Sequence, residues 1–297
     1  MSIRSCGAFR KVVLMLFRTY LFRKITDAFI TALMLLAVVT ALIPLVSILW
    51  HTFRQGWSTM NWSFFTHLPK PVGEPGGGIA NALVGSGLLI LLASAIGIPF
   101  GVLVGIYLAE FNPRGLGTAV RFTNDVLTGI PSIVTGMFVY ALLVVTMGGF
   151  SALAGGVALG LLMIPTVTRS TEEMLKMVPQ SLREASLALG ATPTQTILRV
   201  VLPAALPGIL TGIMLAVARV AGETAPLLFT AFGNRFWSLR LDQPIAALPL
   251  QIFTYAISPY RDWQNQAWGA ALVLVGLVLV LNVFAGLAYS RASRFRR

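Results

Sequence analysis

Four long stretches of this sequence contain no charged residue, and they restrict the possible fold more than any other feature. They cover residues 28–53, 75–109, 126–168 and 263–290. An α-helix needs about 20 consecutive apolar residues to cross the hydrocarbon core of a bilayer. The third stretch is long enough for two crossings with a turn at Gly148-Gly149, and another apolar segment, from about Leu206 to Ala231, contains only two charges. The sequence therefore predicts an all-α polytopic membrane protein with six transmembrane helices.

The distribution of Lys and Arg predicts the orientation of these helices. One side of the membrane would hold 6 of them in residues 1–26, 2 in 108–124, 4 in 169–205 and 4 in 291–297, which makes 16. The opposite side would hold 5, and Arg219 accounts for the last of the 22. Because cytoplasmic loops carry the excess of positive charge, both termini and the 169–205 loop are predicted to be cytoplasmic. The expected location is the bacterial inner membrane.

Composition excludes several classes of function. Hydrophobic residues make up 56% of the chain and charged residues 11%, which is unlike a soluble protein. The net charge of +12 flanks predicted membrane spans, so it indicates contact with anionic lipid headgroups and no binding to nucleic acid. The single cysteine, Cys6, and two isolated loop histidines, His51 and His67, do not form a metal or redox motif. The chain also lacks a P-loop and any hydrolase motif, so we expect no catalytic residue and no ATP site here.

The predicted organisation has four parts. Residues 1–26 form a basic cytoplasmic tail, residues 27–78 the first transmembrane helix and an external loop, residues 79–289 a five-helix core, and residues 290–297 a second basic cytoplasmic tail. In the first core helix, glycines recur every four residues at Gly97, Gly101 and Gly105. This spacing places them on one face, which predicts close packing against a neighbouring helix.

A polar, helix-forming segment interrupts the apolar sequence between residues 184 and 203. Gly190 is a natural end for one helix, and Thr192-Pro193 a natural start for the next. The residues that lie on one face of the first helix by their 3–4 spacing are Leu182, Ala185, Ala188 and Leu189. The pattern predicts two short helices at an angle. They would either lie on the membrane surface or occupy a groove of a soluble partner.

Two features within the predicted spans are candidates for chemistry. Arg219 and Glu223 are four residues apart, which would place both on one face of the fifth span. They would form either a buried ion pair between helices or part of an anion pathway, because guanidinium binds phosphate with two parallel hydrogen bonds. A carboxylate there would accept a hydrogen bond from protonated phosphate, which sulfate does not offer. In the third span, Pro131 should break the helix and free backbone groups near Ser132.

The order of residues in the polar segment resembles a known motif. Glu184-Ala185-Ser186, then Gly190 after three residues, then Leu202-Pro203 is similar to the coupling loop of ABC importer permeases, with Ser186 in place of alanine and Val200 in place of isoleucine. The wider text resembles the permease of phosphate importers of the PstA type. This similarity runs from about residue 72 to 289, and it is carried by residues 72–86, 129–138, 171–191 and 218–230.

The resemblance implies a type I ABC importer permease fold and a role in phosphate import. The chain would form half of the membrane pathway for inorganic phosphate and couple to a separate ATPase. The implied residues for contact with the ATPase are Glu184, Ala185, Ser186, Gly190, Leu202 and Pro203. The implied residues for the substrate pathway are Arg219, Glu223 and Thr224, to which the broken helix adds Ser132.

The implied partners supply the chemistry that this chain lacks. They are a homologous second permease subunit of the PstC type, two ATPase subunits of the PstB type that hold ATP and Mg²⁺, and an external phosphate-binding protein of the PstS type. Three alternatives remain: a permease for a related oxyanion such as arsenate, a stand-alone secondary anion transporter, and a membrane enzyme that acts on phospholipid. Neighbouring genes for an ATPase and a secreted binding protein would separate the first from the other two.

Overall fold

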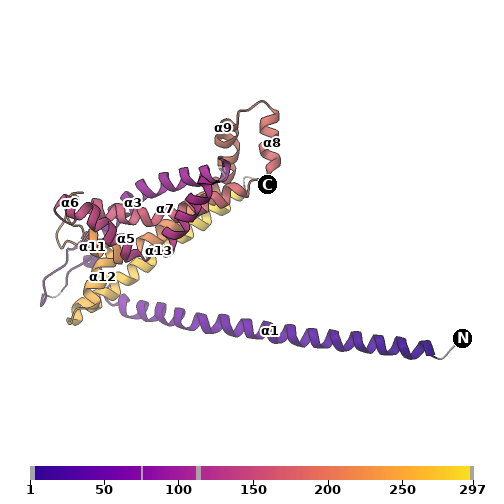
Figure 1. Ribbon diagram of the computed structural model, residues 1–297. Helices are drawn as coiled ribbons and strands as arrows, with labels where there is room; N and C mark the ends of the chain where they lie inside the picture. Colours follow the sequence, from indigo (N-terminus) through magenta and orange to yellow (C-terminus); the bar gives the residue numbers. More distant parts are fainter. Residues whose placement is uncertain (1–3, 75, 112–114, 295–297) are drawn as a thin grey trace. The chain divides into compact units, whose positions relative to one another are not determined.

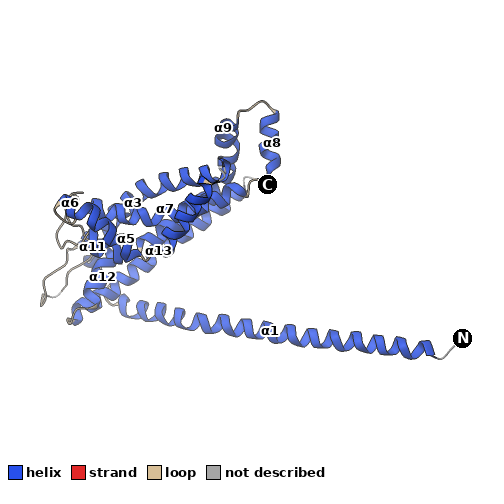
Figure 2. Ribbon diagram, viewed as in Figure 1, coloured by secondary structure: helices blue, strands red, loops and turns tan. Residues whose placement is uncertain are grey.

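The computed structural model describes residues 4–74, 76–111 and 115–294, and the described part is built from helices with no β-strand (Figures 1 and 2). A single bridge joins Phe232 and Ile245. The helices are α1 (Arg4–Trp57), α2 (Trp62–Thr66), α3 (Ala80–Ile106), η1 (Tyr107–Phe111), α4 (Leu116–Gly129), α5 (Ser132–Val139), η2 (Tyr140–Val144), α6 (Val145–Met147), α7 (Ala152–Lys176), α8 (Gln180–Ala188), α9 (Pro193–Thr196), η3 (Ile197–Val201), α10 (Leu202–Ala221), α11 (Ala225–Thr230), α12 (Leu248–Ala256) and α13 (Arg261–Arg294). The three η segments are single π-helical stretches that continue the helices next to them.

The chain forms two compact units, residues 1–54 and 55–297, and each is described here by itself. The first unit is one long helix, the main part of α1. Its apolar segment from Phe22 is long enough to span a membrane, and its described side chains are exposed apart from Thr52, which is buried. Such a surface requires lipid or another subunit to cover it. The expected basic tail at residues 1–26 is helical from Arg4 onward, because no helix-breaking residue separates it from the span.

The count of predicted spans agrees with the structure. Five helices are long and apolar enough to cross a membrane, and a sixth crossing is made if the bent pair of α4 and the α5–α6 segment counts as one span. The two halves of that pair meet at an angle of 102°. The break falls at Ile130-Pro131, as predicted: Ile130 is extended (φ −70°, ψ 130°), a conformation that residues before proline favour. Broken at Pro131, the third crossing is not a continuous helix.

The glycine spacing in α3 produces a close contact with α7, as predicted. A Cβ added at Gly97 would lie 2.7 Å from the Cβ of Met163, and one added at Gly101 would lie 2.7 Å from the Cβ of Val167. The facing residues Met163 and Val167 are fully buried. Absence of side chains along this face lets the two helices approach until their side chains and backbones touch. The α3–α7 pair is therefore the centre of the second unit.

The other core helices surround this pair. A cluster of buried side chains joins α3, α7, α10 and α11, and it includes Leu89, Leu159, Val220 and Leu227. Gly136 of α5 packs against the backbone of Pro226 in α11, where an added Cβ would lie 2.6 Å from the proline Cα. Within this unit, α8 and α9 lie at one end, and α6, α11 and α12 lie at the other (Figure 1). The bundle thus has two distinct ends, connected by the long helices.

The fifth span differs from the prediction. Residues 206–231 were expected to form one continuous helix, but α10 ends at Ala221 and the short helix α11 begins at Ala225. Gly222 caps α10, and Pro226 occupies the first turn of α11, where its missing N–H is not needed. The break leaves Glu223 and Thr224 in the connection between the two helices. Hydropathy does not register such a break, because glycine and proline interrupt a helix without making it polar.

Candidate functional site: the loop between α7 and α10

The segment between α7 and α10, residues 177–201, folds into two short helices, as predicted. The first, α8, is followed by Gly190, which has a φ of +85°. This left-handed conformation is accessible to glycine without steric cost. The second, α9, begins after Thr192, whose hydroxyl accepts a hydrogen bond from the Gln195 backbone N–H at 3.3 Å, while the Gln195 side chain accepts one from the Thr192 N–H at 3.0 Å. This reciprocal capping box and Pro193 fix the start of the helix.

Ser186 holds the two short helices together. Its hydroxyl lies 2.9 Å from the hydroxyl of Thr196, and both residues are buried. The contact joins α8 to α9 across the Gly190 turn. Ser186 is one of the two positions that depart from the family's motif, where alanine is usual. Serine at this position therefore adds a hydrogen bond that connects α8 to α9.

One face of α8 has no covering within this unit. Its members, taken with the residue that follows the helix, are Leu182, Ala185, Ala188 and Leu189, and all four are exposed. Leu182 is 45% exposed and Leu189 is 90% exposed. Glu184 lies beside them in the middle of α8, is also exposed, and forms no ion pair with the described residues. A leucine as exposed as Leu189, at the tip of a small polar hairpin, indicates a surface that another molecule covers.

The last two residues of the motif lie where the loop rejoins the membrane helices. Leu202 is half-buried and packs beside the cluster that contains Leu175, Val178 and Val201. Pro203 is exposed in the first turn of α10, a position in which proline is tolerated. Together they start α10 immediately after the η3 segment. Their placement gives the loop a rigid exit into the bundle.

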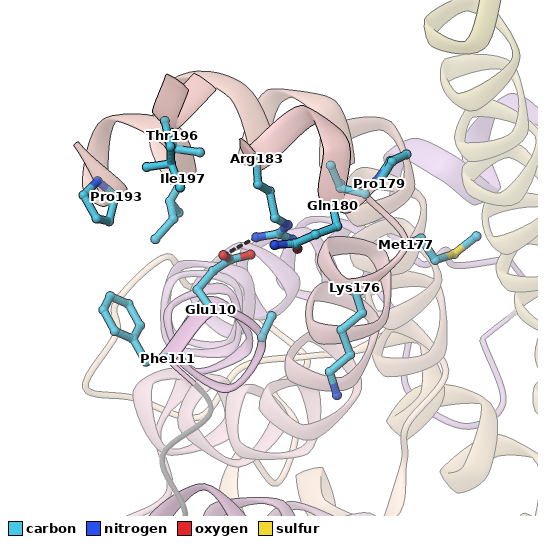
Figure 3. A pocket seen from close by; sticks show the side chains of 13 residues that line it. Glu110, Phe111, Lys176, Met177, Pro179, Gln180, Arg183, Pro193, Thr196 and Ile197 are labelled. Atoms are coloured by element: carbon cyan, nitrogen blue, oxygen red, sulfur yellow. Dashed lines mark hydrogen bonds and ion pairs between the residues drawn. The ribbon is translucent and has the colours of Figure 1, made fainter. Parts of the chain in front are cut away.

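Arg183 attaches α8 to the bundle. Its Nη1 forms an ion pair with Oε2 of Glu110 in η1, and its Nη2 donates to the carbonyl oxygen of Leu175 in α7 at 2.9 Å (Figure 3). The side chains of Arg183 and Glu110 are 17% and 6% exposed. A cavity of about 670 Å³ lies beside them and is lined by residues of η1, the end of α7, α8 and the α9–η3 segment. Figure 3 shows Glu110 and Arg183 pointing toward each other within its wall.

A second group of charges joins α4 and α7 near the same end. Glu172 accepts from Nε of Arg121 at 2.7 Å and from the Lys176 ammonium at 2.5 Å, and Arg121 also donates to the Leu108 carbonyl at 2.9 Å. Asn124 of α4 donates to the Pro165 carbonyl at 3.3 Å. Sequence reasoning identified neither this group nor the Glu110–Arg183 pair. The sequence offered one indication of these ion pairs. Each charged residue lies at the border of a charge-free stretch or in a short polar segment between two charge-free stretches.

The structure places the residues of the predicted anion pathway on different elements. Arg219 is exposed on the last turn of α10, and Glu223 lies beyond the helix in the α10–α11 connection, with no ion pair between them. The prediction that they share one helical face is therefore wrong, because Gly222 ends α10 between them. The buried ion-pair interpretation is also wrong, because Arg219 is exposed and forms no ion pair with Glu223. Thr224 precedes α11 and Ser132 begins α5, and these helices pack together through Gly136 and Pro226.

The described residues form no candidate metal site. Within residues 4–74, 76–111 and 115–294, no three His, Cys, Asp or Glu side chains are close enough to hold a metal ion. The polar groups of the loop are used for capping and for ion pairs between elements. The arrangement therefore offers a structural surface at one end of a helical membrane bundle.

A helical bundle with five or six candidate membrane crossings and an exposed helical hairpin at one end defines a multi-pass membrane protein. Residues 97–296 match the family described as the binding-protein-dependent transport system inner membrane component. The chain belongs to this family. Membership places it in the inner membrane as part of an ABC importer that also has an ATPase and a binding protein.

Several relatives match along most of their length. A protein of Yersinia pestis named phosphate transport system permease protein PstA is 48% identical over 83% of this chain and 84% of its own. The protein of the same name from Haemophilus influenzae is 43% identical over 91% of this chain and 96% of its own. PstA 1 of Mycobacterium tuberculosis is 40% identical over 93% of this chain and 91% of its own. The resemblance seen in the sequence is thereby confirmed.

Solved structures confirm the fold. A subunit of a bacterial ABC transporter that imports alginate superposes with a TM-score of 0.61 over 89% of this chain and 96% of its own, at 16% identity. A subunit of the inward-facing MetNI methionine ABC transporter gives a TM-score of 0.59 over 72% of this chain and 94% of its own, at 23% identity. The chain thus has the type I permease fold. It is a transport permease subunit.

Proposed function

We propose that this chain is the permease subunit that forms half of the pathway for inorganic phosphate in an ATP-driven importer. The observation that carries the proposal is the 40–48% identity to proteins named phosphate transport system permease, over 83–93% of this chain. The exposed surfaces of α1 and of the α8 face are consistent with one half of a larger assembly. In such an assembly the substrate pathway would lie between two homologous permease subunits.

The α8–α9 hairpin is the proposed contact with the ATPase. Its exposed face presents Ala185 and Leu189, and Glu184 supplies a negative charge beside them. Gly190 sets the angle between the helices, Ser186 joins them, and Leu202-Pro203 connects the hairpin to α10. ATP binding would close the two ATPase subunits, and the hairpin would move with the groove in which it lies. That displacement would drive the rocking of the helices.

The proposed substrate pathway runs past Arg219 and the two helix breaks. Arg219 is exposed on α10, so its guanidinium is accessible to an anion between the two permease halves. It would bind two phosphate oxygens at once. Glu223 and Thr224 lie in the next connection and would accept and donate hydrogen bonds to a protonated phosphate. Ser132 begins α5, whose packing on α11 keeps the two breaks in one region.

The proposed partners follow from what the chain lacks. A homologous permease of the PstC type would complete the pathway, and two ATPase subunits of the PstB type would bind ATP and Mg²⁺. A phosphate-binding protein of the PstS type would deliver the substrate at the end with α6, α11 and α12. The bias of Lys and Arg supports cytoplasmic termini and a cytoplasmic hairpin.

Substitution of Arg219 tests the proposed pathway. Arg219→Gln removes the charge, and since this side chain is exposed and unpaired with Glu223, folding and assembly should be unaffected. We expect phosphate uptake by vesicles that contain the complete transporter to be lost. Arg219→Lys keeps the charge without the planar geometry, so it should retain part of the uptake. Wild-type uptake by a well-assembled Arg219→Gln variant would remove Arg219 from the pathway.

A further inference from the structure

Arg183 is the side chain through which the α8–α9 hairpin contacts two different membrane helices. Its Nη1 binds Glu110 at the C-terminal end of the α3–η1 helix, and its Nη2 binds the Leu175 carbonyl near the end of α7. Both partners belong to the helices that pack most closely in the bundle, through the glycine face of α3. One guanidinium thus connects the hairpin to both members of the central helix pair.

The geometry fixes the direction of α8 relative to the core. The guanidinium is planar and presents its N–H groups in a rigid fork, so two hydrogen bonds to partners on different elements determine its orientation. The pair is shielded from water, since the side chains are 17% and 6% exposed. A charge-assisted hydrogen bond in such surroundings is stronger than one at the surface. Movement of α8 therefore displaces Glu110 with it.

The cavity beside the pair shows that side-chain packing does not replace this connection. About 670 Å³ of space lies between the hairpin and the ends of α3 and α7, and both Glu110 and Arg183 line it. A helix pressed tightly against its neighbours transmits motion through many contacts. Across this space the Glu110–Arg183 pair joins α8 to η1 (Figure 3), while apolar packing of Val178 and Val201 holds the two ends of the 177–201 segment against α3 and α7.

We infer that the Glu110–Arg183 pair is a positioning strut that carries the displacement of the α8–α9 hairpin into α3. From Glu110 the displacement passes along α3 and, through the glycine face, to α7. This role rests on the proposed function, in which the hairpin contacts the ATPase. Arg183 precedes the residues that resemble the family's motif, and Glu110 lies 73 positions away in sequence. The strut adds a route to the bundle that is separate from the direct exit through Leu202-Pro203.

The strut is tested by the amount of transport obtained per ATP hydrolysed. The variants Arg183→Met and Glu110→Gln are assembled with the second permease, the ATPase and the binding protein in vesicles, and phosphate uptake and ATP hydrolysis are measured together. Loss of coupling between two sites typically amounts to about 5- to 150-fold. We expect the ratio of uptake to hydrolysis to fall about tenfold in both variants, with the ATPase still bound. The matched control is Arg169→Met, because Arg169 forms exposed ion pairs with Glu173 and Asp125 that do not involve the hairpin.

Exchange of the charges separates a strut from a merely structural pair. In the double variant Glu110→Arg with Arg183→Glu, the ion pair can form again, and we expect the ratio to recover in part. The double variant Glu110→Gln with Arg183→Gln leaves no buried charge unpaired, so it should assemble even if the single variants do not. A normal ratio in this assembled double variant would overturn the strut. A low ratio in it, with recovery on charge exchange, would support it.

The same measurements distinguish failure of the strut from failure of the proposed function on which it rests. Suppose that Gly190→Val lowers both uptake and substrate-stimulated ATP hydrolysis, while Arg183→Met and Glu110→Gln leave the ratio of uptake to hydrolysis unchanged. The hairpin then contacts the ATPase, but force reaches the bundle by another route and the strut is wrong. If the wild-type chain binds no ATPase at all, the proposed function itself fails.

Discussion

Replacement of Gly190 by valine should uncouple the transporter while leaving the membrane helices folded. Gly190 has a φ of +85°, and a Cβ at this position would meet nothing within 4 Å. The cost of the substitution is therefore confined to the backbone. For an ordinary L-residue the left-handed conformation costs about 1–2 kcal/mol, and a β-branched residue is at the upper end or beyond it. The turn between α8 and α9 should consequently relax toward another angle.

A cost of about 2 kcal/mol changes the equilibrium ratio of the native turn to its alternatives about thirtyfold. The hairpin would still be present, since Ser186 and Thr196 remain able to join the helices. Its exposed face, however, would no longer have the shape that fits a groove in the ATPase. We expect substrate-stimulated ATP hydrolysis and phosphate uptake to fall by a similar factor, measured on complexes purified with the same yield as the wild type.

Two control variants isolate the cause. Asparagine tolerates the left-handed conformation, so Gly190→Asn should retain most of the activity. Gly73 has a φ of +89° and equally open surroundings but lies in the loop between α2 and α3. Gly73→Val therefore introduces the same backbone strain at a distance from the hairpin, and we expect normal coupling. Normal uptake and hydrolysis in Gly190→Val, with normal expression, would refute the reasoning and remove the hairpin from the contact with the ATPase.

Three further predictions follow from the packing and the charge distribution. Gly101→Leu should destabilise the protein by about 1–3 kcal/mol, because its Cβ would lie 2.7 Å from the Val167 Cβ. Gly87→Leu on the same helix is the control, since a Cβ there meets nothing within 4 Å. Thermal unfolding in detergent compares the two variants, and equal stability would contradict the close contact. Ser186→Ala should destabilise the α8–α9 hairpin by about 1 kcal/mol, because the 2.9 Å hydrogen bond with Thr196 is lost. We expect faster proteolysis of the hairpin, and an unchanged cleavage rate would contradict the role of this hydrogen bond. An impermeant thiol reagent should label Glu74→Cys and Arg240→Cys from outside and Lys176→Cys and Arg294→Cys only from inside; external labelling at 176 would contradict the orientation.

Much of the fold follows from local patterns in the sequence. Charge-free stretches of the right length predict the spans, and the four-residue spacing of Gly97, Gly101 and Gly105 predicts the α3–α7 contact. Gly190 and Thr192 predict the end of one helix and the start of the next. In each case the signal lies within one element and depends on backbone preferences or periodicity. Tertiary contacts reinforce these local preferences, so the predictions that rest on them agree with the structure.

The remaining features depend on contacts between distant parts of the chain. Glu110 and Arg183 are separated by 73 residues, and no spacing rule relates two charges so far apart. The break after Ala221 was missed because Gly222 and Pro226 interrupt a helix without lowering its hydropathy. That break removed Arg219 and Glu223 from a common face. The sequence correctly marked both residues as unusual within an apolar segment, but their relation required the backbone.

The central claim is that this chain carries phosphate only as part of an ATP-driven complex. The direct measurement is uptake of radiolabelled phosphate into vesicles containing this chain, with the second permease, the ATPase and the binding protein added or omitted in turn. The account predicts uptake that requires ATP and every partner, and that is unaffected by excess sulfate. Phosphate uptake by the chain alone, driven by an ion gradient without ATPase, would contradict the account and favour a stand-alone transporter.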